Sequence, residues 1–394
     1  MLRTSIPFQE TDRSAWIAQL NKELQEQTQL LQYKDPIEGF SIDLTERYPS
    51  VGVPSPTSEY WTSFYKLNVQ NEKAANKLIL SALMEGAAGL LLHSKNESCN
   101  WELVLEGVEV AYIKCWIQVD SALQNQQLQK TCPQDKWAHL SILNLEHTAQ
   151  NYFSGFDIQQ AGANISCQLS SLLIDLHRSL ENHSVQTHYV FELGIGNNYF
   201  QEIAKFRAFR HLLTRLEAVH ECSIAYQLLG STGFSNKSLK DPYTNLLRLA
   251  TEALSAVNGG ADAVCIQPYD ALSQDGADDF SRRMALNIGN LIQEEAQMNQ
   301  TQDPLKNANV IEALTTQIVN QTWQKLLALD QQNQTEQLLS DLEKTRQHKT
   351  EAFQKGAATL IGINAFENTF EVKNKNWGTL PTYYGVPYLI FELV

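Results

Sequence analysis

The sequence predicts an α/β fold, a (β/α)8 TIM barrel that follows an N-terminal arm of helix and extended chain. From about residue 70, apolar runs of roughly five residues alternate with helical patterns, which is typical of parallel strands joined by crossover helices. About eight such units fit into roughly 290 residues, and this favours a closed barrel over an open doubly wound sheet. We therefore expect an arm over residues 1–70, and a barrel with a short C-terminal tail over residues 71–394.

The arm begins with a predicted helix. Thr11 or Asp12 can cap this helix, and Trp16, Leu20 and Leu24 then recur at helical spacing. The stretch that follows is rich in proline and in aromatic residues and shows little regular pattern. Such rings need burial, so we expect the arm to pack on its own barrel or against a partner chain.

The barrel elements follow in order along the chain. The expected strands span residues 86–93, 108–117, 138–143, 163–167, 188–193, 222–229, 263–267 and 359–364. The expected helices span residues 74–85, 169–180, 199–219, 243–257, 280–295 and 311–329. The arm contributes no strand in this prediction.

Charge and hydropathy exclude several classes of partner. The chain carries 30 Lys and Arg against 44 Asp and Glu, a formal net charge of −14, and shows no basic stripe, so we expect no nucleic-acid partner. It has no apolar stretch of about 20 residues, so we expect no membrane helix. The N-terminus has no continuous apolar region, and a cytoplasmic location is expected.

Cysteine and histidine residues indicate no metal site. The six cysteines form no CxxC pair, and we expect buried, reduced thiols. The nearest group of histidines is His177, His183 and His188, for which solvated or helix-capping roles are favoured over a zinc trio. The segment from Asp175 to Leu180 begins like the DxHxxG loop of cobalamin-binding domains but lacks its glycine, so His177 is expected on a helix surface.

Four segments carry a more specific signal. Residues 200–210 read FQEIAKFRAFR, residues 236–248 read NKSLKDPYTNLLR, residues 280–287 read FSRRMALN, and residues 361–366 read IGINAF. In this order and spacing they resemble the acyl-CoA-binding barrel of the methylmalonyl-CoA mutase family. The matched positions, expected to be structural, are Lys205, Arg207, Asp241, Tyr243, Asn245, Arg248, Arg283 and Asn287.

Some residues of this signature are typical of the beginning and end of a helix. Asp241 fits a helix N-cap with Pro242 at the first helical position, and Gly259–Gly260 fits the end of that helix. The signature therefore indicates the barrel more firmly than an activity.

The departures from the family pattern bear on the role. The resemblance implies an adenosylcobalamin radical reaction in a barrel threaded by the coenzyme A tail. The catalytic chains carry a histidine twelve residues before DPY, and that position here is Leu229, which cannot donate a hydrogen bond to a thioester. The family's GGSY segment is replaced by residues 306–309, and no cobalamin-binding domain is expected in this chain.

These departures favour a small, non-catalytic chain of the two-chain members of the family. The resemblance then implies a heterodimer with a catalytic large mutase subunit, an isomerase of propionate metabolism that holds the adenosylcobalamin. This chain is expected to bind no cofactor or metal and to be inactive alone. Two alternatives stay open: an active acyl-CoA mutase barrel that uses a separate cobalamin-binding chain, and a barrel repurposed to bind another ligand.

The sequence leaves open whether bulky side chains close the barrel axis as a plug. The candidate side chains for this plug come from the expected strands, with a strand phase that is uncertain by one residue. They are Leu90, Leu92, Ile113, Cys115, Phe191, Tyr226 and Ile266.

Overall fold

The computed structural model describes residues 12–24, 31–56, 60–145, 150–182, 185–186, 188–331, 334–368 and 375–394. Eight strands form one sheet, and the ladders between neighbouring strands are parallel. In chain order they are β3 (Thr62–Asn68), β4 (Gly89–His93), β5 (Lys114–Val119), β6 (Leu140–Asn144), β7 (Tyr152–Ser154), β8 (Tyr189–Ile195), β9 (Tyr226–Thr232) and β10 (Ala263–Cys265). Strand β10 pairs with β3, so consecutive strands follow one another around a ring.

Asn151 closes the ring between β6 and β7, where the sheet has its seam. Its backbone N–H donates to the carbonyl of Asn144 over 3.1 Å, and its side chain donates to the carbonyl of Ile142 over 3.0 Å. Its Oδ1 accepts the N–H of Asn144 over 2.6 Å. The predicted (β/α)8 barrel is thereby confirmed, with one asparagine in place of a strand ladder at the seam.

Helices cover the outside of the barrel. They are α2 (Glu72–Met84), α3 (Trp101–Val104), α4 (Ala122–Thr131), α5 (Gln134–Trp137), α6 (Phe156–Gln160), α7 (Ile165–Asn182), α8 (Tyr199–Val219), α9 (Thr244–Asn258), α10 (Asp279–Asn290), α11 (Asn309–Asp330) and α12 (Gln334–Gln354). Short helical turns lie at η2 (Val110–Tyr112), η4 (Leu291–Glu295) and η5 (Phe391–Leu393). The main core lies between α7, α8, α9 and α11 and the strands they cover.

Two barrel strands differ from the prediction. Strands β3 and β7 were not expected. Residues 163–167 instead form a short connection and the first residues of α7, which begins at Ile165, and residues 359–364 form turns with one isolated bridge. The barrel therefore begins before the boundary expected at residue 70. The physical reason is that β3 and β7 complete the eight positions of the ring, which leaves no place for another strand. Short apolar runs do not by themselves distinguish a strand from the start of a buried helix.

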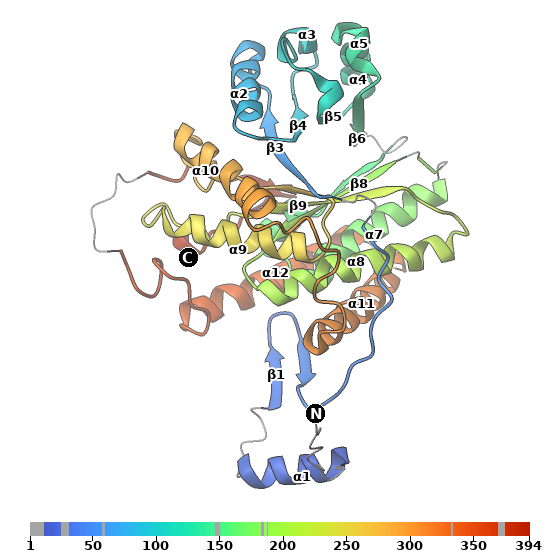
Figure 1. Cartoon of the computed structure of the whole chain (residues 1–394), viewed down its shortest axis with the longest axis vertical. Coiled ribbons are helices and arrows are strands. Elements are labelled where there is room, and N and C mark those ends of the chain that lie inside the picture. Colours follow the sequence, from blue (N-terminus) through green and yellow to red (C-terminus); the bar gives the residue numbers. More distant parts are fainter. Residues whose placement is uncertain are drawn as a thin grey trace, which may run out of the picture.

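The arm holds a helix and a hairpin that lie outside the barrel. Helix α1 (Arg13–Leu24) has no buried residue, and Figure 1 shows it at one end of the molecule beside the hairpin of β1 (Gln32–Asp35) and β2 (Phe40–Asp43). The hairpin packs on α11, where Gln317 accepts from the N–H of Ser41 and donates to its carbonyl. The opposite end holds β3–β6 with α2–α5.

Two further expectations concern chemistry. All six cysteines are free thiols, as predicted, and Cys222 is the one among them that is only partly buried. Across the described part of the chain, no helix combines the length and apolar character needed to cross a bilayer.

The hairpin of β11 (Thr382–Tyr383) and β12 (Val386–Pro387) lies in the C-terminal tail.

Candidate functional site

Bulky side chains fill the lumen of the barrel. One buried cluster consists of inward-facing residues from the ring of strands, namely Phe64, Leu91, Trp116, Leu143, Tyr152, Val190, Leu229, Ala263 and Cys265. The rings of Phe64 and Trp116 lie 4.2 Å apart between centroids. Leu229 is 0% exposed and lies in this cluster, so the expected histidine position is part of an apolar plug. We call this cluster the lumen plug.

The axis is blocked, but by other residues than the candidates that the sequence offered. Leu90, Leu92, Ile113 and Cys115 face the helices outside the barrel, in the cluster under α2–α4. The remaining candidates, Phe191, Tyr226 and Ile266, lie in the main core on the outer side of the strands. The prediction was wrong by one residue in strand phase. Successive side chains along a strand point to opposite faces, so a shift of one residue selects side chains on the outer face instead of those in the lumen.

Glu192 is the central acceptor of a polar network that lies next to the plug, toward the carboxyl ends of the strands. This side chain is 1% exposed and comes from β8. Its Oε1 accepts from Lys66 Nζ over 2.7 Å and from Ser231 Oγ over 2.6 Å. Its Oε2 accepts from the hydroxyls of Tyr152 and Ser154 over 2.5 and 2.8 Å. Four donors occupy both oxygens, so this carboxylate offers no further acceptor site to a substrate.

The charges of this network are fixed at neutral pH. Burial opposes ionisation of Glu192, but Lys66 and the hydrogen bonds from Ser231 and Tyr152 outweigh it and lower the pKa of Glu192. Burial likewise opposes the charge of Lys66, and Glu192 outweighs it and raises the pKa of Lys66. Burial raises the pKa of the Cys265 thiol to about 12, so this thiol in the lumen stays protonated. The network is a satisfied ion pair without a free acid, base or nucleophile.

A small cavity lies beside this network. It has a volume of about 190 Å³, and Lys66, Cys265, Gln267 and Arg282 are among its lining residues. Sites for drug-sized molecules commonly measure about 300–1,000 Å³. This cavity is therefore too small for an acyl-coenzyme A.

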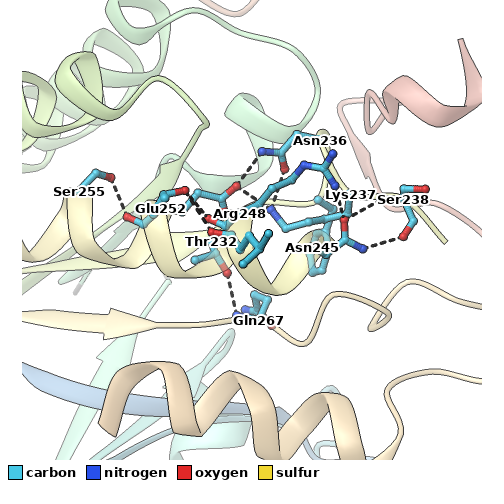
Figure 2. Close-up of polar contacts among 12 residues, drawn as sticks. Thr232, Asn236, Lys237, Ser238, Asn245, Arg248, Glu252, Ser255 and Gln267 are labelled. Atoms are coloured by element: carbon cyan, nitrogen blue, oxygen red, sulfur yellow. Dashed lines mark hydrogen bonds and ion pairs between the residues drawn. The ribbon is translucent and has the colours of Figure 1, made fainter. Parts of the chain in front are cut away.

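The family signature after β9 forms a second buried polar cluster (Figure 2). Lys237 Nζ donates to both oxygens of Glu252 over 2.7 and 2.9 Å, and Asn236 Nδ2 donates to Glu252 Oε1 over 2.7 Å. Burial raises the pKa of Glu252 and lowers the pKa of Lys237, and each partner counteracts the shift of the other. The pair connects the loop after β9 to α9 and is fully enclosed by protein.

The other signature residues of this loop hold backbone in place. Asn245 Oδ1 accepts from the N–H of Ser238 over 3.0 Å and its amide donates to the carbonyl of Ser238 over 2.6 Å. Arg248 donates to Asn245 Oδ1 over 2.8 Å and to the carbonyl of Ile361. In Figure 2 these side chains point toward one another across the start of α9, with Thr232 and Gln267 at the adjacent strand ends.

One detail of the signature differs from the prediction. Asp241 was expected to cap the helix, whereas α9 begins at Thr244, with Tyr243 at the cap position and no side-chain cap bond. Ser238 Oγ accepts the N–H of Asp241 over 2.9 Å, so the segment before α9 is a polar turn instead of a first helical turn. Tyr243 is 56% exposed and packs edge-on against Phe280.

The predicted positions on α8 and α10 have contrasting surroundings. Lys205 is fully buried, donates to the carbonyl of Gly194 over 2.5 Å and pairs with Glu202. Arg207 is also buried and pairs with Glu312 over 2.8 Å and with Asp303. On α10, Arg283 is exposed and Asn287 is partly buried. The structure thus brings Asp241, Tyr243, Asn245 and Arg248 together around the start of α9, apart from the two buried cations of α8.

The Glu192 network was not predicted from the sequence. Its donors Lys66, Tyr152 and Ser154 come from the two strands that were not predicted. A signal was present in β8, where Glu192 interrupts an apolar strand. A carboxylate in such a run requires buried donors, but their positions depend on the neighbouring strands.

His177 lies on a helix, as expected, where it is partly buried. His177 lies on α7 and contacts His220 over 2.8 Å between ring nitrogens, while His183 lies outside the described residues. His177 also lies 3.5 Å from Glu181 and 3.4 Å from Asp330. Within the described ranges, no group of three or more potential ligands could hold a metal ion.

The fold and its lumen define a (β/α)8 barrel whose axis is closed by side chains. A family model described as methylmalonyl-CoA mutase matches residues 140–379, which is more than half of the chain. The chain therefore belongs to the methylmalonyl-CoA mutase family, in agreement with the resemblance of its sequence segments.

Relatives of this family align with part of the chain. The methylmalonyl-CoA mutase small subunit of Porphyromonas gingivalis is 32% identical over 194 residues, which cover 46% of this chain and 31% of that protein. The methylmalonyl-CoA mutase of Rhizobium meliloti is 31% identical over 182 residues, covering 43% of this chain and 25% of that protein. The chain thus matches only about a quarter to a third of the length of these relatives.

Solved structures of dihydropteroate synthases also align with the chain. The one from Coxiella burnetii covers 67% of this chain and 99% of that chain, with 13% identity and a TM-score of 0.34. The similarity is too low to carry an argument.

Proposed function

We propose that this chain is the small, non-catalytic subunit of a heterodimeric methylmalonyl-CoA mutase. The large subunit would bind adenosylcobalamin and interconvert methylmalonyl-CoA and succinyl-CoA, and this chain would support its structure. The observation that carries the proposal is the lumen plug, in which Leu229 occupies the position of the catalytic histidine.

The polar groups next to the plug support the same proposal. A radical reaction on a thioester needs a chamber, together with free donors that position the carbonyl. Glu192 is saturated by four donors, and the adjacent cavity measures about 190 Å³. These residues do not fit adenosylcobalamin chemistry, and we derive no reaction step in this barrel.

The arm provides a second argument for a partner chain. Helix α1 has 12 residues and buries none of them in this chain. Isolated helices shorter than about 12–15 residues are marginal in water, so α1 gains its stability from a surface outside this chain. Trp16, which is 48% exposed, and the partly buried Ile17, Leu20 and Leu24 are the apolar side chains available for this contact. An obligate interface of this kind typically buries more than about 2,000 Å².

Co-expression with a catalytic large subunit of the family tests the proposal. We expect a stable complex that converts methylmalonyl-CoA in the presence of adenosylcobalamin, and no turnover by this chain alone. Turnover by the purified chain with added adenosylcobalamin, or with a separate cobalamin-binding chain, would instead favour an active barrel. Failure to form a complex with large subunits, including one encoded in the same genome, would contradict the proposal.

A further inference from the structure

A cavity of about 510 Å³ lies outside the barrel lumen, near the carboxyl end of β8. Its walls come from the β1–β2 turn, the α6–α7 connection, the start of α8, the end of α12 and the C-terminal tail. Its volume is within the range of small-molecule sites, about 300–1,000 Å³. No residue of the lumen plug lines it, and of the family-signature positions only Lys205 does.

Glu38 is the first charged group of this cavity, and the β1–β2 turn holds it rigidly. Asp35 Oδ1 accepts the N–H of Glu38 over 2.9 Å, and Gly39 completes the turn with a φ of 74°. Glu38 Oε2 accepts the N–H of Ile165 over 2.8 Å. Burial raises the pKa of this carboxyl to about 7, because it outweighs the opposing effects of Lys349 and of the hydrogen bond from Ile165.

Lys349 is the second charged group, and it comes from α12. Its Nζ donates to the carbonyl of Ala163 over 2.7 Å. Lys349 and Glu38 interact through space, but among the described contacts they form neither a hydrogen bond nor an ion pair. Burial lowers the pKa of Lys349, so its charge is also incompletely compensated.

Gln168 adds a buried acceptor without a partner. This side chain is 0% exposed and lines the cavity, and its amide nitrogen donates to the carbonyl of Gly155 over 2.8 Å. Its Oε1 has no hydrogen-bond partner in the structure. A buried amide oxygen without a donor is costly, which points to a ligand or water that donates to it. The neighbouring Lys205 and Glu202 pair with each other.

We propose that this cavity binds a small zwitterion with an apolar side chain, such as an amino acid or a dipeptide. The ligand's ammonium group would face Glu38 and Gln168, and its carboxylate would face Lys349. A ligand with one charge would leave the opposite protein charge uncompensated, and a zwitterion compensates both.

Apolar walls define the side-chain part of the ligand. Phe353 and Leu360 are buried, and the ring of Phe353 lies 5.1 Å from that of Phe391 between centroids. All three residues line the cavity. Aromatic walls favour a flat or branched hydrocarbon side chain, so phenylalanine is the appropriate first probe. This inference does not depend on the proposed role in a mutase.

Calorimetric titration of the full chain tests the inference. We expect L-phenylalanine to bind, and 2-phenylethylamine and 3-phenylpropanoate, which each lack one charge, to bind about tenfold or more weakly. Glu38→Gln is expected to weaken phenylalanine binding and to remove the preference over 3-phenylpropanoate. Lys349→Met is expected to remove the preference over 2-phenylethylamine.

Matched controls separate binding from folding. Glu343→Gln and Lys344→Met change exposed charges on α12 and should bind phenylalanine like the unchanged chain. Circular dichroism checks that each variant is folded, and the comparison of the three ligands on the unchanged chain needs no variant. The inference is overturned if phenylalanine, leucine, methionine and a leucyl-phenylalanine dipeptide all fail to bind at millimolar concentration. It is equally overturned if the single-charge analogues bind as tightly as phenylalanine.

Discussion

Leu229 is the residue on which the proposed role depends, because it places a hydrocarbon in the centre of the barrel, at the position where the resemblance implies a catalytic histidine. It belongs to the lumen plug together with Trp116 and Phe64. Replacing it by histidine would bury an imidazole among these apolar side chains. A single reversion is therefore insufficient to recover a catalytic chamber, because the lumen would remain filled.

Leu229→Ala tests whether the plug is a packed core. The substitution removes buried hydrocarbon from a fully enclosed position, and we expect the free energy of unfolding to fall by about 2–5 kcal/mol. Urea unfolding followed by circular dichroism measures this change. Leu247→Ala is the matched control, since Leu247 is 70% exposed on α9 and its truncation should cost less than about 0.5 kcal/mol. Equal losses for the two variants would contradict a packed lumen.

Glu38 makes stability depend on pH. Its pKa is raised from an ordinary 4.5 to about 7, so the folded chain binds this proton more tightly than the unfolded chain. The contribution of Glu38 therefore becomes less favourable as the pH rises through this window. Glu38→Gln keeps an acceptor for the N–H of Ile165 and removes the titration.

The pH series compares Glu38→Gln with the unchanged chain. From pH 5 to pH 8, we expect the variant to gain about 2–3 kcal/mol in unfolding free energy relative to the unchanged chain. Chemical denaturation at several pH values measures this difference. A difference that stays constant with pH would show that Glu38 titrates as an ordinary surface carboxyl.

At the residue scale, sequence reasoning identified Leu229 but not its neighbours. The family motif fixed the position of Leu229 relative to Asp241, and this required no knowledge of strand phase. The plug residues depend on strand phase, and an error of one residue selected Leu90 in place of Leu91. The four donors of Glu192 could not be assigned, because they depend on how several strands align.

The connection from β9 to α9 shows how the signature acts at the scale of an element. Lys237 and Glu252 form a buried ion pair, and Asn236 adds a donor to the same carboxylate. Removing one partner leaves an uncompensated buried charge, whereas removing both charges does not. The signature therefore fixes the loop against the helix without requiring a catalytic role.

Lys237→Met is expected to lower the free energy of unfolding by about 3–5 kcal/mol. The double variant Lys237→Met/Glu252→Gln should recover part of this loss, since the remaining amide is neutral. Urea unfolding of both variants measures the coupling. The exposed pair Lys355–Glu351 provides the control, and Lys355→Met should cost less than about 1 kcal/mol. A neutral effect of Lys237→Met would contradict the structural role of the pair.

Elements were predictable where their pattern was long, as for α8 and α11, and uncertain where it was short. Strand β7 has three residues and β3 follows a proline-rich stretch, so neither had a distinctive sequence signal. Residues 359–364 are apolar like a strand, yet they form turns because the ring is already complete. The number of strands was thus predictable from the repeating pattern, whereas the identity of two of them depended on closure of the sheet.

The whole molecule consists of a barrel, a hairpin that packs on its helices, and the helix α1, which the barrel does not cover. Figure 1 shows α1 and the β1–β2 hairpin extending beyond α11 and α12. The hairpin is tied to α11 by side-chain hydrogen bonds, whereas no residue of α1 is buried. This division suggests that the two parts of the arm contribute differently to folding and to assembly.

Deletion of residues 1–24 separates these contributions. Because α1 buries no residue, we expect the Tm of the truncated chain alone to be unchanged, and its complex with the large subunit to dissociate more readily. Differential scanning calorimetry and analytical ultracentrifugation measure the two quantities. Trp16→Ala in the full chain is expected to weaken the complex to a smaller extent. A truncated chain that loses stability alone but pairs normally would contradict this assignment of the arm.

The proposed role requires a barrel that cannot admit an acyl-coenzyme A, and titration of methylmalonyl-CoA into the purified chain tests this most directly. We predict no saturable binding and no succinyl-CoA when adenosylcobalamin is added, under conditions in which a catalytic family member shows both. Saturable binding that is accompanied by formation of succinyl-CoA would contradict the account.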